Sequence, residues 1–188
     1  MTNIKRSLKG GSATPVILVS SSDNPVTGAA LTIGVLGSAL LEGDLFSVTV
    51  VDSIVEDGTS LDVLLITGST NVAVSFAAMI AGDTDLAFFE DTTISDDGSS
   101  ESVVNMNRNS AKLSNTFVFQ APTVTGVGTE LFNVSFPGGE KKDSTSGSGG
   151  THLGWILKPS SNYLIRITNQ SGNAQTISAL INIVETEL

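Results

Sequence analysis

The residues of this sequence that could do chemistry are a single histidine and several short clusters of carboxylates. His152 is the only histidine and there is no cysteine, so a zinc site rich in His or Cys cannot be assembled. A Ser-His-Asp triad would need His152, yet no Gly-x-Ser-x-Gly elbow accompanies it, and no P-loop or Gly-x-Gly-x-x-Gly motif occurs. We therefore predict no catalytic residue, no metal ligand and no cofactor, and we interpret the chain as non-enzymatic.

Four acidic clusters could offer oxygen ligands to calcium: Glu56-Asp57-Gly58, Asp83-Thr84-Asp85, Glu90-Asp91 and Asp96-Asp97-Gly98. None of them matches the EF-hand loop pattern. Asp-Gly is equally typical of a tight hairpin turn. We favour turns at these positions, and calcium binding stays an open alternative.

The charges are distributed unevenly along the chain, whose formal net charge is −10. Lys5, Arg6 and Lys9 lie near the N-terminus, and the next cation is Arg108. Phosphate binding needs clustered cations, so we do not expect the body of the protein to bind nucleic acid. The acidic surface fits either a solvated face or a docking face for a basic partner. We predict that these four cations contact a partner molecule or a neighbouring protomer, and that Arg108 pairs with a carboxylate.

The sequence predicts a flexible basic arm over residues 1–14, followed by one domain over residues 15–188. Gly10-Gly11 would act as a hinge, and the Gly/Ser-rich stretch 137–150 is typical of a long loop. The N-terminus lacks the apolar segment of a signal peptide, and no apolar run approaches the roughly 20 residues that span a bilayer. We expect synthesis in a cytoplasm without export, and no membrane contact.

Short apolar runs separated by turn residues favour strands throughout the chain. Alternation of period two is clear over 163–167 and 177–183. Many strands spaced about 8–12 residues apart are typical of a sandwich or barrel. The one competing helix is Ala29–Leu41, where two interior glycines make a strand the favoured interpretation.

Two local features need separate interpretation. The run Asn105–Ser110 is rich in asparagine, which bonds its own main chain, so it predicts a rigid polar turn. Trp155 lies in an apolar run, Leu153–Leu157, and a core position is the favoured interpretation. The alternative is an exposed platform for a glycan.

The order of motifs resembles that of a family of small virion structural proteins from tailed bacteriophages. The segments that carry the resemblance are Leu41–Phe46, Glu56–Gly68, Phe88–Thr93, Asn105–Ser110, Pro122–Thr129, Trp155–Pro159 and Tyr163–Gly172. They span about residues 40–188. The family's early histidines and the aromatic residues of its last strand are missing here.

This resemblance implies an all-β, jelly-roll-like antiparallel β-sandwich with an extended N-terminal arm. It implies a protein of the virion surface that decorates or cements the capsid, contacts the major capsid protein and forms a homotrimer. A tail-associated or receptor-binding lectin-like module, with Trp155 holding a glycan, is the alternative.

Overall fold

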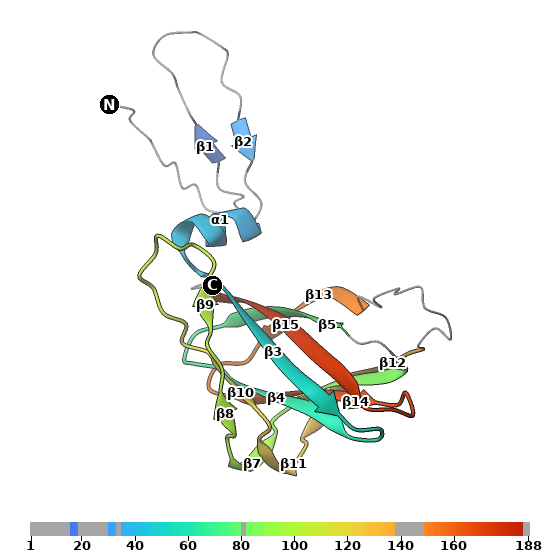
Figure 1. Ribbon diagram of the computed structural model, residues 1–188. Coiled ribbons are helices and arrows are strands. Elements are labelled where there is room, and N and C mark those ends of the chain that lie inside the picture. The colour runs from blue at the N-terminus through green and yellow to red at the C-terminus, as the bar shows by residue number, and fades with distance from the viewer. Residues whose placement is uncertain (1–15, 19–29, 33–34, 80–81, 138–148, 186–188) are drawn as a thin grey trace.

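The computed structural model describes residues 16–18, 30–32, 35–79, 82–137 and 149–185 (Figure 1). The expected arm over residues 1–14 lies outside the described residues. So does most of the expected loop over residues 137–150.

The chain folds into two packed antiparallel sheets of six and five strands, which confirms the all-β sandwich. The larger sheet has the order β12–β6–β14–β4–β10–β8, with β4 (Ser60–Ile66), β6 (Thr84–Glu90), β8 (Ser99–Ser100), β10 (Phe117–Gln120), β12 (Thr129–Phe136) and β14 (Asn162–Asn169). The smaller sheet has the order β13–β5–β15–β3–β9, with β3 (Leu45–Val55), β5 (Val72–Met79), β9 (Val104–Asn105), β13 (Gly149–Leu157) and β15 (Gln175–Glu185). Two further antiparallel pairs join β1 (Val16–Leu18) to β2 (Ala30–Thr32) and β7 (Thr93–Asp96) to β11 (Thr123–Gly126).

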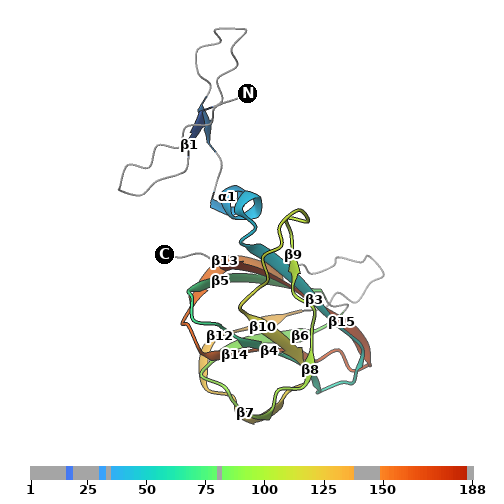
Figure 2. The ribbon, with the colours of Figure 1, turned by 90° about the vertical axis from the view of Figure 1, so that its left-hand side faces the viewer.

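The strand pairing follows one long antiparallel hairpin wound across both sheets. β3 pairs with β15, β4 with β14, β5 with β13, and β6 with β12. Successive strands along each arm of the hairpin alternate between the five-stranded and the six-stranded sheet. The view along the layers in Figure 2 shows β13, β5, β3 and β15 stacked over β12, β14, β4 and β6.

The segment between β6 and β12, residues 91–128, is an excursion inserted at the tip of this hairpin. It begins and ends as the β7–β11 pair, and between them it reaches the opposite edge of the sandwich. There β10 pairs with β4 and β9 pairs with β3. Because unpaired strand edges invite further pairing, the excursion protects one edge of each sheet.

The core lies between the sheets and follows the alternation of the strands. In β14, Tyr163, Ile165 and Ile167 point inward, as the period-two pattern predicts. In β15, Ile177, Ala179, Ile181 and Ile183 do the same. Each fully buried large apolar side chain contributes about 1.5–3 kcal/mol of transfer free energy, so these rows stabilise the pairing of the two layers.

The expectation of a strand across Ala29–Leu41 is wrong for most of that segment, because α1 (Val35–Glu42) is a helix. Its end is a Schellman cap: Gly43, with φ of 76°, donates to the carbonyl of Leu40, and Asp44 donates to that of Ala39. Ala39 is the buried contact of the helix and packs with Leu45 and Val184. The Schellman cap and the burial of Ala39 therefore outweigh the unfavourable helix propensity of Gly37.

Candidate interaction surfaces

The residues proposed from the sequence are only partly placed by the structure. Lys5, Arg6 and Lys9 lie outside the described residues. His152 falls within β13, but its side chain is outside the described part. Arg108 and Trp155 are described, and the structure brings neither close to the other: Arg108 lies in the loop after β9, and Trp155 lies on β13.

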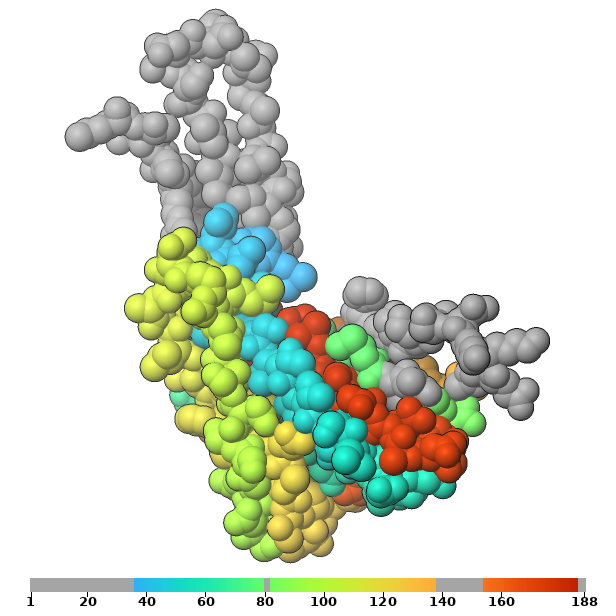
Figure 3. Space-filling view, in the orientation of Figure 1, coloured from blue at the N-terminus to red at the C-terminus, as the bar shows by residue number. Residues whose placement is uncertain are grey.

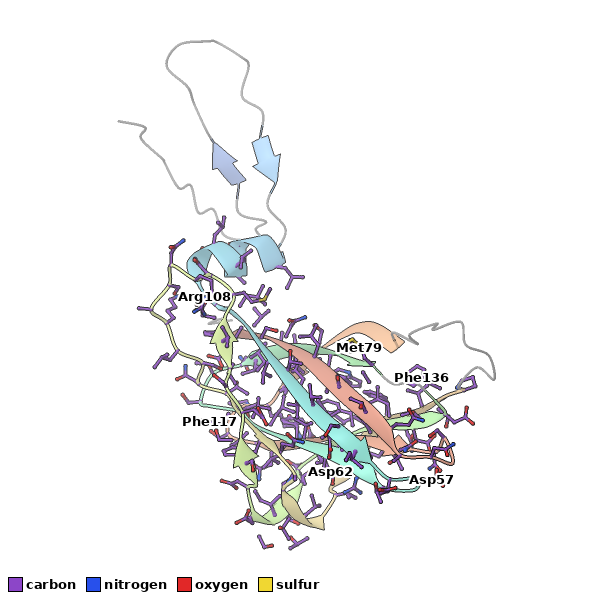
Figure 4. All side chains as sticks on the ribbon, in the orientation of Figure 1. Asp57, Asp62, Met79, Arg108, Phe117 and Phe136 are labelled. Carbon is purple, nitrogen blue, oxygen red and sulfur yellow. The ribbon has the colours of Figure 1, made fainter. Side chains whose placement is uncertain are left out.

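Arg108 is exposed on the loop near α1, at the end of the sandwich shown in Figure 4. Its guanidinium donates to the main-chain carbonyl of Asn105 over 3.5 Å. Within the part of the chain that the structure describes, no carboxylate forms an ion pair with it. A carboxylate partner for Arg108 from another molecule stays a prediction.

The asparagine-rich loop is held by side-chain to main-chain hydrogen bonds, as its sequence predicts. Asn105 is buried, and its Nδ2 donates to the carbonyls of Gly43 at 2.9 Å and Lys112 at 3.2 Å. Its Oδ1 accepts from the N–H of Asn107 at 2.9 Å. Asn107 in turn donates to the carbonyl of Leu41 at 3.1 Å. The loop is therefore attached to the C-terminal end of α1.

A groove of about 550 Å³ lies beside this loop and is lined largely by polar groups. Its main carboxylate, Glu185, accepts from the hydroxyl of Ser114 at 2.6 Å and from the N–H groups of Asn115 and Thr116 at 2.9 Å each. A second carboxylate, Asp44, forms an ion pair with Lys112. These two acids already have partners, so the arrangement anchors the loop to β15.

The acidic clusters that could suggest calcium lie largely at turns. Gly58 and Gly98 have positive φ values of 72° and 86°, as tight turns require. Asp96 accepts from the N–H of Gly98 at 2.9 Å, and Asp57 accepts from the N–H of Gly172 at 2.8 Å. Among the described residues, no three His, Cys, Asp or Glu side chains gather closely enough to hold a metal ion.

Trp155 packs against the aromatic part of the core. Its ring stacks on Phe132 with centroids 5.9 Å apart and planes 15° apart, and it meets Phe88 at 5.9 Å and 58°. Phe132 also stacks on Phe76, and Phe88 on Tyr163. These contacts are typical of a core tryptophan that fastens β13 to the six-stranded sheet.

A hydrogen-bonded cluster that sequence reasoning missed joins Glu90, Lys158 and Tyr163. The ammonium of Lys158 donates to Glu90, and this bond is the main reason that the pKa of Glu90 lies below its ordinary value. The same bond raises the pKa of Lys158. Burial raises the pKa of Tyr163 to about 12, so its phenol keeps its proton at neutral pH. The cluster is a structural tie, and its residues lie 68 and 73 positions apart in the chain.

The outer face of the six-stranded sheet carries charge and is partly covered. Asp62 on β4 and Arg166 on β14 form two parallel hydrogen bonds of 2.8 and 2.6 Å. Beside them, Ala87, Phe89 and Leu164 are buried beneath Val124 and Val127, which belong to the excursion.

The outer face of the five-stranded sheet is different, because none of its described side chains is ionisable. We call it the neutral face, and its four rows across the strands are Leu45–Val184–Ala73–Ile156, Ser47–Asn182–Ser75, Thr49–Leu180–Ala77 and Val51–Ser178–Met79. Three of its apolar side chains are strongly exposed: Ile156 at 69%, Val51 at 49% and Met79 at 43%. Figure 3 shows β3 in cyan and β15 in red side by side on this face.

At the α1 end, the neutral face deepens into an apolar groove of about 400 Å³. Leu36 of α1 and Met106 of the asparagine-rich loop form its sides, together with Leu45, Ala73 and Val184 of the sheet. Leu36 is 64% exposed and Met106 is 45% exposed. The groove therefore offers contact area to another molecule.

No family model matches the chain, and neither a curated protein nor a solved structure matches it. In the described part of the chain, no helix has both the length and the apolar character needed to cross a membrane.

Proposed function

We propose that this chain is a non-enzymatic structural protein of a tailed-phage virion, which decorates or cements the capsid through protein–protein contacts. Three features support the proposal. The motif order over residues 40–188 resembles that of such virion proteins. The two sheets are wound from one long hairpin, and this connectivity fits the jelly roll that the resemblance implies. The described side chains of one sheet face carry no charge, in a chain with 19 acidic residues.

The observation that carries the proposal is the contrast between the two outer sheet faces. One face is charged and partly covered by the protein's own excursion. The other is uncharged and ends in an apolar groove. Contiguous exposed apolar patches larger than a few hundred Å² mark protein interaction sites. A capsid protein that works through many modest contacts needs such surfaces and does not need a reactive centre.

In this proposal the N-terminal cations provide the contact to the capsid. Lys5, Arg6 and Lys9 would bind an acidic groove of the major capsid protein or of a neighbouring protomer. Fully extended, 11 residues reach at most about 36–40 Å, enough to cross onto a neighbouring subunit. The exposed Arg108 is a further candidate contact from the body.

The test is to locate the chain in purified particles of the phage that encodes it. Heads and tails are separated, and the chain is quantified in each by mass spectrometry. We expect it in the head fraction at a fixed ratio to the major capsid protein. Recovery with tails would support the lectin-like alternative, and its absence from particles would overturn both virion functions.

A second test addresses the arm. A variant with Lys5→Gln, Arg6→Gln and Lys9→Gln should occupy capsids less than the natural chain does, most clearly at low salt, where charges are least screened. The control is Lys141→Gln with Lys142→Gln, which removes cations elsewhere. Equal occupancy of all three proteins at low salt would contradict a role for the arm.

A further inference from the structure

The neutral face has the size and exposure of an interface, and its chemistry limits what can cover it. Its rows contain alanine, serine, threonine, asparagine and aliphatic side chains, and no carboxylate, ammonium or guanidinium group. A basic partner would gain no ion pair there. A partner that carries the same net charge as this chain would meet no repulsion within the contact.

A second copy of the chain is such a partner. Each copy carries a formal charge of −10, so contact through most other surfaces would bring carboxylates together, which is unfavourable. On the opposite sheet, for example, Asp85 lies on an outward row, and its hydrogen-bond partners Ser135 and Gln170 are uncharged. Contact through the neutral face instead leaves the carboxylates at the rim, where water and salt screen them.

The shape of the face also suits a second copy. Small side chains such as Ser75, Ala77 and Ser178 allow two sheets to approach to about 10 Å, the usual spacing of packed sheets. Met79 and Val51 stand exposed at one end of the face, and the apolar groove beneath α1 lies at the other. A two-fold axis in the plane of the face and perpendicular to the strands would place Met79 of one copy over the groove of the other, and the reverse.

The area of the neutral face is near the lower limit for a specific contact. Four strands about 4.8 Å apart and seven residues of about 3.3 Å each give roughly 450 Å² of flat area per copy. Two copies contribute roughly 900 Å², close to the ~1,000 Å² expected of a biological interface. Leu36 of α1, which lines the groove and is exposed, adds to it.

We infer that the neutral face is where one copy of this chain packs against another, with the groove beneath α1 accepting side chains from the partner copy. The inference rests on the self-association that the proposed function contains, and it assigns that association to named residues. Face-to-face contact is isologous and closes as a dimer. The trimer that the family resemblance implies would need two different surfaces.

The test is sedimentation equilibrium of the purified full-length chain over micromolar concentrations, with charges placed on and off the face. Thr49→Glu and Met79→Glu lie on the neutral face. Thr123→Glu and Leu113→Glu are matched controls at an exposed strand threonine and an exposed apolar residue elsewhere. We expect the natural chain and both controls to associate equally, and both face variants to associate roughly a hundredfold or more weakly.

Two further measurements sharpen the result. Association of the natural chain should hold or tighten as salt rises, because salt screens the repulsion between copies and the contact contains no ion pair. Since the chain has no cysteine, Thr49→Cys should be cross-linked into dimers by a short bismaleimide, whereas Thr123→Cys should not. This readout does not require the glutamate variants to fold.

A natural chain that stays monomeric, or face variants that associate as well as their controls, would overturn the inference. Neither result would contradict the proposed attachment to the capsid, because that attachment is tested separately on purified particles. A monomeric chain whose face variants lose capsid occupancy would show that the face binds a capsid protein, and the second copy would be excluded.

Discussion

The phenol of Tyr163 on β14 donates a hydrogen bond to Oε2 of Glu90 on β6 at 2.9 Å. The phenol oxygen of Tyr163 accepts the main-chain N–H of Lys158 at 2.8 Å, and the ammonium of Lys158 contacts Oε1 of Glu90 at 2.6 Å. Tyr163 is fully buried and its ring stacks on Phe88 with centroids 5.7 Å apart. One side chain thus joins β14 and β6 to the turn that follows β13.

Replacing Tyr163 with phenylalanine should lower the free energy of unfolding by about 1–3 kcal/mol, because it leaves two polar groups without a partner while the ring stacking is kept. Urea unfolding followed by circular dichroism measures the change. The control, Thr125→Val, removes an exposed hydroxyl that bonds to Thr93, and it should change stability by less than about 0.5 kcal/mol. Equal effects of the two variants would contradict a structural role for the phenol.

The pKa of about 12 for Tyr163 also predicts how stability depends on pH. Below pH 10, the ordinary pKa, the phenol is protonated in both the folded and the unfolded chain. Between pH 10 and 12 the unfolded chain loses this proton and the folded chain keeps it, so this contribution to stability is lost as pH rises. Because Tyr163 is the only tyrosine, ultraviolet absorbance of phenolate reports it alone. A midpoint near pH 10 in a chain that is still folded would disagree with this prediction.

The Asp62–Arg166 pair offers a third prediction. Its two parallel bonds hold Arg166 firmly, and the hydrogen bond to Asp62 raises the pKa of the guanidinium. A double-mutant cycle with Asp62→Asn and Arg166→Gln should give a coupling of about 1 kcal/mol that falls as salt rises. The control cycle uses the Asp44–Lys112 pair, whose lysine side chain is 55% exposed. The coupling energy of the Asp44–Lys112 pair should be smaller than that of the Asp62–Arg166 pair. A larger coupling energy for Asp44–Lys112 would show that geometry does not set the strength of these pairs.

Much of the sandwich could be predicted because alternation is a local property of each strand. The inward residues of β14 and β15 are the ones that the pattern selects. Leu164, which alternation places outside, is nevertheless buried. The reason is that Val124 and Val127 cover that face, and their approach depends on the path of the excursion rather than on local sequence.

Only part of the neutral face could have been predicted from the sequence. The outward positions of β5 and β15 are visibly uncharged in the sequence once their alternation is known. That β5, β15 and β3 lie side by side depends on pairing between residues more than a hundred positions apart, such as Asn182 with Ser75. No short motif encodes such a pairing, because it results from the winding of the whole hairpin.

Asn105 provides a fourth prediction, since its buried amide serves three main-chain groups. Asn105→Ala removes bonds to the carbonyls of Gly43 and Lys112 and to the N–H of Asn107. We expect a loss of about 2 kcal/mol or more in the free energy of unfolding. The matched control is Asn109→Ala in the same loop, where the bond to Asn107 comes from the main-chain N–H and survives the change. Hydrogen exchange should accelerate at Asn107 in the first variant only.

The last prediction concerns two glycines with nearly the same backbone conformation and different surroundings. Gly43 has φ of 76° and Gly58 has φ of 72°. A side chain in this left-handed region costs about 1–2 kcal/mol. A methyl group at Gly58 would meet nothing within 4 Å, whereas at Gly43 it would lie 2.6 Å from Cβ of Ser110 and still closer to its hydroxyl.

Gly58→Ala should therefore cost only the conformational penalty of about 1–2 kcal/mol. Gly43→Ala should cost at least about 1–3 kcal/mol more, because overpacking forces the Ser110 loop away from the cap of α1. Adding Ser110→Gly should recover the steric part in Gly43→Ala and nothing in Gly58→Ala. Urea unfolding of the five proteins measures these differences. Equal losses for the two alanine variants would mean that the loop does not pack on the end of α1 as closely as the structure has it. The apolar groove would then lack the side that Met106 of this loop forms.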